Sequence, residues 1–132
     1  MTTARRIRIT AGRATVDAEL NDTRAATAVW QALPLAAKAE TWGDEVYFDT
    51  SLALPEEQPR AVVDRGDVGY WPPGRALCLF YGPTPASRGD EIRPASPVTV
   101  IGRIVGDADR LRAVRPGDPV RVERADGPGG PA

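Results

Sequence analysis

Hydrophobic and polar residues alternate at the start of the chain with the two-residue period of a half-buried strand. Residues 6–11 place Ile7 and Ile9 on one face and arginine or threonine on the other, and residues 14–20 repeat the pattern. Gly12 lies in the short connection between them. We therefore predict an antiparallel hairpin that turns one face toward the core.

The pattern then changes to a helical period. Four apolar residues follow one another at i, i+3, i+4 and i+7: Ala26, Val29, Trp30 and Leu33. Asn21 or Asp22 is placed to cap this helix, and Pro34 to end it. We expect the helix to pack on a sheet through this single stripe, with Trp30 as its largest contact. Trp42 is likewise expected to be a core residue.

Short apolar or alternating segments separated by Gly and Pro make up most of the remaining chain. We expect strands at 35–40, 45–48, 68–71, 75–81, 98–105 and 120–123. Thr41 to Asp44 are a turn candidate, and Asp107 is placed to cap a second, shorter helix that runs through Val114. Gly102 interrupts its strand and indicates a bulge or a close backbone approach.

Seven or eight short strands and two helices favour a mainly β fold. Packing as two layers would bury the half-apolar faces, and so would closure of one sheet. We predict a closed antiparallel β-barrel of about eight strands, capped by one longer and one short helix, because closure removes exposed strand edges. The domain is expected to span residues 1–124, followed by a disordered tail at 125–132.

The segment from Gly66 to Pro85 holds four of the eight aromatic residues. It reads as a hairpin around Pro72-Pro73-Gly74, and its second arm is apolar on both faces. Leu77 and Leu79 point one way, whereas Cys78 and Phe80 point the other. One face builds the core, and the other must be covered by a ligand, a second copy or the chain itself.

Composition removes several function classes. The net charge of −1 shows no nucleic-acid footprint, and no apolar segment is long enough to span a membrane. The chain has no histidine and one cysteine, so histidine-based catalysis and the common metal sites are absent. No phosphate-binding glycine motif occurs. We predict no catalytic residue, metal or cofactor, no signal peptide, and by default a cytoplasmic location.

Two kinds of residue remain as candidates for function. Aromatic residues near the Pro-Pro-Gly turn, Tyr70, Trp71 and Tyr81, are either core residues or the rim of a groove for an extended peptide or a small amphipathic ligand. Phe80 is expected in the core. Carboxylates at Asp44, Glu45 or Asp64 leave open an enzyme acting on a small molecule, and Asp67 is expected to bind nearby backbone amides in a turn.

The residues GDVGYWPPGRALCLFYG at 66–82, TWGDEVYF at 41–48 and PASPVTVIGRI at 94–104 resemble the small prokaryotic cyclophilin-like proteins. The resemblance spans about residues 5–124 and implies an eight-stranded barrel closed by helices. Cyclophilins are peptidyl-prolyl isomerases with an arginine and a histidine in their groove. Here Arg65-Gly66-Asp67 resembles the end of the family's Gln-Gly-Gly-Asp run, which places Asp64 at the glutamine position.

The departures from the family fall on its catalytic residues. Tyr47-Phe48-Asp49 stands where the arginine-containing motif is expected, and no arginine follows. Gly82-Pro83 resembles the step after the substrate-lining strand. The groove candidates are thus Tyr47, Phe48, Asp64, Tyr70, Trp71, Phe80 and Tyr81. We predict a module that binds a proline-containing peptide or a small molecule. The alternatives are a weak isomerase using Arg60, Arg65 or Arg75, and a homo-oligomeric structural or assembly subunit such as a homodimer.

Overall fold

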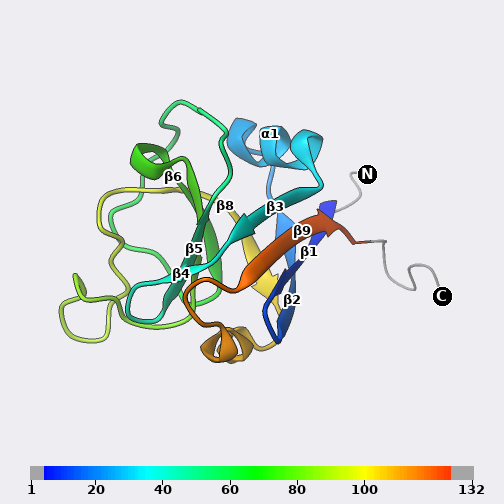
Figure 1. Ribbon diagram of the computed structural model, residues 1–132. Coiled ribbons are helices and arrows are strands. Elements are labelled where there is room, and N and C mark those ends of the chain that lie inside the picture. The colour runs from blue at the N-terminus through cyan, green and yellow to red at the C-terminus, as the bar shows by residue number, and fades with distance from the viewer. Residues whose placement is uncertain (1–4, 126–132) are drawn as a thin grey trace.

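The computed structural model describes residues 5–125, which form a nearly closed antiparallel barrel (Figure 1). Its nine strands are β1 Arg5–Ala11, β2 Ala14–Leu20, β3 Leu35–Lys38, β4 Glu40–Thr41, β5 Glu45–Asp49, β6 Asp67–Trp71, β7 Ala76–Phe80, β8 Thr99–Val105 and β9 Pro119–Arg124. The helices are α1 Arg24–Ala32 and the 3-10 helices η1 Pro72–Gly74 and η2 Ala108–Ala113. The predicted fold class is confirmed.

The N-terminal hairpin is confirmed in position and in orientation. Strand β1 pairs with β2 from Arg5–Leu20 to Ala11–Ala14. The apolar residues of both strands are buried inside the barrel, and Ile7 and Ile9 are at most 1% exposed. The two-residue period therefore located both the strands and their buried face, because one face of this hairpin meets water.

A bent segment closes the barrel and accounts for the ninth strand. The sheet order is β3-β9-β1-β2-β8-β6-β7-β5-β4, so its two ends are strands that follow each other in sequence. The single strand predicted at 35–40 is split at Ala39, which is fully buried and exchanges backbone hydrogen bonds with Gly117 and Asp118. On one side of Ala39 the segment pairs with β9, and on the other with β5.

Helix α1 lies where the helical period placed it, although its cap differs from the prediction. Thr23 is the N-cap residue and accepts a hydrogen bond from the Ala26 amide, while Asn21 supports Thr23. Trp30 packs against the main core and is partly buried. The Arg124 guanidinium lies over its ring, 4.3 Å from the centroid. The small residues Ala25, Ala26 and Val29 are the fully buried residues of the helix.

The other local predictions are also settled by the structure. The register between β6 and β8 shifts after Val68, which makes the predicted bulge. A Cβ atom at Gly102 would lie 2.3 Å from the Glu19 carbonyl oxygen. The bulge and the close backbone approach predicted for this glycine are therefore both present. Asp107 caps η2 through the Asp109 amide. Ala125 is buried and belongs to the barrel, whereas residues 126–132 of the predicted tail lie outside the described residues.

Residues 50–66 close one end of the barrel by binding its interior polar groups. The Tyr70 hydroxyl, inside the barrel, accepts from the Leu54 amide and donates to the Leu52 carbonyl. Glu57 accepts hydrogen bonds from two backbone amides at the start of α1. This segment therefore holds the helix over the barrel. Within residues 5–125, no helix is long and apolar enough to cross a membrane.

Candidate functional site

Strand β7 divides its side chains between two separate hydrophobic clusters. Leu77 and Leu79 belong to the main core inside the barrel. Cys78 and Phe80, on the opposite face, belong to a second cluster outside it, together with Val63, Ile92 and Val98. The predicted division of the two faces is confirmed, and the outer face is covered largely by the chain itself.

The covering segment is residues 82–98, and it is fixed by hydrogen bonds although it contains no long strand. The Thr84 hydroxyl donates to the Arg93 carbonyl, and the Ser87 hydroxyl oxygen accepts from the amides of Thr84 and Arg93. Isolated strand-like bridges join Ile92 to Val63 and Val98 to Arg60. The loop is thus a firm second layer over β6 and β7.

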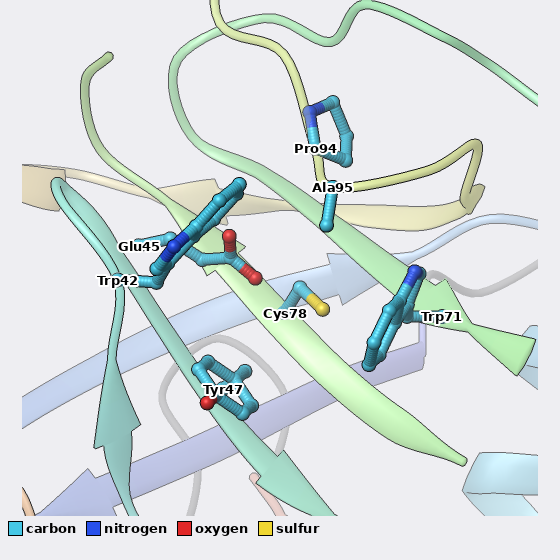
Figure 2. Close-up of a pocket in the computed structure, with 7 residues that line it drawn as sticks. All are labelled: Trp42, Glu45, Tyr47, Trp71, Cys78, Pro94 and Ala95. Carbon is cyan, nitrogen blue, oxygen red and sulfur yellow. The ribbon is translucent and has the colours of Figure 1, made fainter. Parts of the chain in front are cut away.

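Between this loop and the outer face of the barrel lies a cavity of about 270 Å3, which we call the outer pocket. Its lining residues are Trp42, Glu45, Tyr47, Trp71, Cys78, Pro94 and Ala95. In Figure 2 the rings of Trp42 and Trp71 stand on opposite sides, with Tyr47 on a third side and Pro94 and Ala95 on the fourth. The Glu45 carboxyl and the Cys78 thiol point between the two tryptophans.

The register of three strands sets the floor of the outer pocket. Cys78 of β7 is paired with Tyr47 of β5 on one side and with Gly69 of β6 on the other. A Cβ atom at Gly69 would lie 2.9 Å from Val98 Cγ2. The absence of a side chain there lets the loop approach the sheet, so the loop forms a wall of the pocket.

The turn from Trp42 to Glu45 forms one end of the outer pocket. The Trp42 amide donates to the Glu45 carbonyl at 3.0 Å, and the Asp44 amide donates to the Pro83 carbonyl at 2.9 Å. Gly43 has φ +59°, and a Cβ atom there would lie 2.7 Å from Pro85 Cδ. The turn therefore requires glycine, and its contact with the loop fixes the position of Trp42.

Glu45 is the chemically distinctive residue of the pocket, because its side chain is almost completely buried. The residue is 5% exposed, and burial raises the pKa of its carboxyl to about 7. The Cys78 thiol donates a hydrogen bond to it, which partly opposes that rise. No lysine or arginine among residues 5–125 forms an ion pair with Glu45. The carboxyl thus titrates near neutral pH without a cation.

Burial also changes the pKa values of the titratable neighbours of Glu45. Burial and the negative charge of Glu45 raise the pKa of the Cys78 thiol well above its usual range, so this cysteine is not a thiolate nucleophile. Burial also raises the pKa of Tyr47, as do the charges of Glu40 and Glu45. Trp71 is oriented by its ring nitrogen, which donates to Ser96 Oγ at 2.7 Å.

The structure places two of the seven groove candidates, Tyr47 and Trp71, in the outer pocket. Phe48 and Tyr70 are not at a rim: both are at most 1% exposed inside the barrel, because strand alternation turns them away from their outward neighbours Tyr47 and Trp71. Phe80 is in the core of the second cluster, as expected.

The remaining two candidates also lie away from the outer pocket. Tyr81 packs in the main core, and Arg112 lies over its ring at 5.1 Å. Asp64 is exposed on another face of the barrel, near Asn21 and Arg103. Asp67 accepts a hydrogen bond from the Asp64 amide, which confirms its predicted turn role.

Sequence reasoning missed Trp42 and underused Glu45. Trp42 was expected in the core, but it is partly exposed and forms a wall of the outer pocket. Glu45 was weighed only as one of several carboxylates. The sequence did hold a sign of this site. Glu45 and Tyr47 are two residues apart on one strand and so face the same side of the sheet, and Cys78 lies on the strand that is apolar on both faces. The pairing of β5 with β7, which brings them together, was not visible.

None of the three arginines considered for isomerase chemistry lines the outer pocket. Arg65 pairs with Asp109 at 2.6 Å, and the exposed Arg75 has left-handed backbone beside η1. Arg60 is exposed beside Asp64 and Asp67. Among residues 5–125, no three acidic or cysteine side chains are grouped so that they could hold a metal ion.

Comparison with known proteins agrees with the barrel. A family model described as cyclophilin-like matches residues 5–123. The solution structure of a hypothetical protein from Archaeoglobus fulgidus is similar, with 44% sequence identity and a TM-score of 0.82. The similarity covers 95% of this chain and 98% of that one. A comparison with curated proteins finds no match.

Proposed function

This chain belongs to the cyclophilin-like family, and we propose that it is a binding module that takes a small amphipathic molecule in the outer pocket. The observation that carries the proposal is a cavity with aromatic walls around one buried carboxyl. Small-molecule sites are mostly apolar cavities of about 300–1,000 Å3 with a few placed polar groups. The outer pocket, at about 270 Å3, suits a small ligand or one side chain of a peptide.

The walls of the pocket are firm enough to bind without rearrangement. Trp71 is hydrogen-bonded to Ser96, and the turn that carries Trp42 is bonded to Pro83. A preformed site loses little entropy on binding, which favours affinity for a small ligand. Binding is therefore favoured over a role for this surface in packing alone.

The two alternative functions receive less support. Prolyl isomerisation requires a cation that stabilises the twisted amide, and Arg60, Arg65 and Arg75 all lie away from the pocket. A homodimer was suggested by the second apolar face of β7. The chain's own residues 82–98 cover that face, so it supplies no reason for a second copy.

The test is a titration monitored by the three tryptophan ring N–H resonances. A panel of small amphipathic amines, alcohols and acids, together with short proline-containing peptides, is added to the labelled protein. We expect binders to shift the Trp42 and Trp71 signals and to leave Trp30, on α1, unchanged as an internal control. If no compound moves Trp42 or Trp71, or if Trp30 always moves with them, the proposed site is wrong.

A protease-coupled isomerisation assay separates the alternative activity. At micromolar protein, we expect the cis–trans isomerisation rate of the proline-containing peptide to equal the uncatalysed rate. A rate above it that falls on Trp71→Leu would favour the isomerase over the binding module.

A further inference from the structure

We propose that the ligand of the outer pocket carries a compact organic cation, an alkylated ammonium group, which binds beside Glu45 and between Trp42 and Trp71. This inference rests on the proposed function and specifies the chemical class of the ligand.

The first observation is a buried acid without a counterion among residues 5–125. Glu45 is 5% exposed, and within those residues the only hydrogen-bond partner of its side-chain carboxyl is the neutral Cys78 thiol. A buried carboxylate is costly unless it is paired with a cation. A ligand that brings one positive charge would compensate Glu45 where the chain does not.

The second observation is the arrangement of the aromatic rings. Trp42 and Trp71 stand on opposite sides of the Glu45 carboxyl, with Tyr47 beside it (Figure 2). Aromatic faces attract cations within about 6 Å, and cages of such rings recognise alkylated ammonium groups. The carboxyl and the rings thus favour the same ligand charge.

The chain itself uses cation–ring contacts elsewhere but not here. Arg124 lies over Trp30 and Arg112 over Tyr81. Within residues 5–125 these are the cation–ring contacts that occur, and neither involves a ring of the outer pocket. No lysine or arginine of residues 5–125 therefore occupies the position over these rings that a ligand cation would take.

The remaining titratable groups around Glu45 oppose an anion. Cys78 on β7 and Tyr47 on β5 are neutral near pH 7, burial raises the pKa of both further, and Glu40 on β4 adds a negative charge beyond Tyr47. On the covering loop, Arg93 is engaged by Glu91 at 2.7 Å. A negatively charged ligand would meet repulsion, and a neutral one would leave Glu45 uncompensated.

The experiment compares two probes of nearly the same shape, choline and its neutral carbon isostere 3,3-dimethyl-1-butanol. Trp30→Phe protein is used, so both remaining tryptophans report on the outer pocket by fluorescence. At pH 8 we expect choline to bind about tenfold or more tightly than the alcohol, since the charge adds a carboxylate and cation–π contact. Below pH 7 the choline affinity should fall, by at most about tenfold per pH unit, and then level off near the affinity of the Glu45→Gln variant once Glu45 is protonated.

Glu45→Gln keeps the shape of the side chain and removes its charge, so we expect it to reduce the preference for choline to the roughly two- to fivefold that the cation–π contacts alone supply. Glu19→Gln, an exposed glutamate on β2, makes the same charge change away from the pocket and should keep the preference. Equal binding of both probes by the unaltered Glu45 protein overturns the inference even if the glutamine variant does not fold.

The outcomes separate this inference from the proposed function. If choline fails or shows no preference while other compounds still shift Trp42 and Trp71, the cation is wrong and the binding module stands. If no compound shifts either ring, both are wrong. A preference for choline that survives Glu45→Gln undiminished and is independent of pH also overturns the role of the carboxyl.

Discussion

The two faces of the sheet around β7 are both buried, yet they are built differently. Inside the barrel, Leu77 and Leu79 meet side chains from other strands, and both are fully buried. Outside, Cys78 and Phe80 meet a loop, and the covering leaves a cavity beside Cys78. Strands around a barrel converge on one interior and fill it, whereas one loop contacts a sheet only where its anchors hold it.

This difference in packing separates the inner face, which contributes to stability, from the outer face, which leaves room for a ligand. An apolar residue at position 45 would pack in the outer pocket without desolvation of a carboxyl. The chain places Glu45 there instead, and no lysine or arginine of residues 5–125 forms an ion pair with it. Positions that break the ordinary rules of packing are those where function is most often found. We therefore place the proposed ligand site on the outer face.

The sharpest test of this comparison uses two neighbouring residues of β7. Leu79→Ala removes a fully buried side chain from the barrel interior and should lower the free energy of unfolding by about 2–5 kcal/mol. Cys78→Ala, on the outer face at the edge of the cavity, should cost about 1 kcal/mol or less, because it removes one atom. Urea denaturation measures both. Equal losses would show that the two faces are packed alike.

The next largest effect concerns pH. The Glu45 pKa is raised from 4.5 to about 7 on folding, so the folded state holds its proton more strongly. The stability from this group is fully present below pH 4.5 and is lost as pH rises to about 7. The loss is roughly 3 kcal/mol over this range.

Glu45→Gln isolates that loss, because other titrating groups cancel in the difference between the two proteins. We expect the stability of the variant relative to the original protein to rise between pH 4.5 and 7 and to level off above it. Denaturant unfolding at half-unit steps of pH measures this difference. A flat difference would show that the acid is not buried in solution.

The smallest difference expected lies between two glycine variants, and it separates the cost of backbone strain from the cost of losing the contact that positions Trp42. Gly43 and Gly89 both have positive φ, at +59° and +64°. A Cβ atom would strike Pro83 and Pro85 at Gly43 but would meet nothing within 4 Å at Gly89. Alanine should therefore cost about 1–2 kcal/mol at Gly89 from strain alone, and about 1–3 kcal/mol more at Gly43 from the clash.

The same pair of variants reports on the pocket. Gly43→Ala should also shift the Trp42 ring N–H resonance and weaken ligand binding, since the turn must move away from the loop. Gly89→Ala should leave both unchanged. Identical behaviour of the two variants would mean that the turn is not held by this contact.

Much of the fold could be predicted from short-range patterns. The hairpin of β1 and β2, helix α1, the bulge before Gly102 and the cap of η2 all follow from signals within a few residues. The closure of the barrel at Ala39 did not, because a single apolar segment carries no sign that its two halves pair with different strands. The burial of Tyr70 depended on hydrogen bonds from residues 50–66, which no local pattern shows.

For the candidate site, the sequence could predict the kinds of residue involved but not their arrangement. The sequence by itself determined that β7 has two apolar faces, that histidine chemistry is absent, and that aromatic residues gather near this strand. Only the tertiary structure decided that β5 pairs with β7 and that residues 82–98 cover the result. Strand parity is a local property of the backbone, whereas the partner of a strand depends on contacts between distant segments. Those contacts place Glu45 in an aromatic pocket rather than in water.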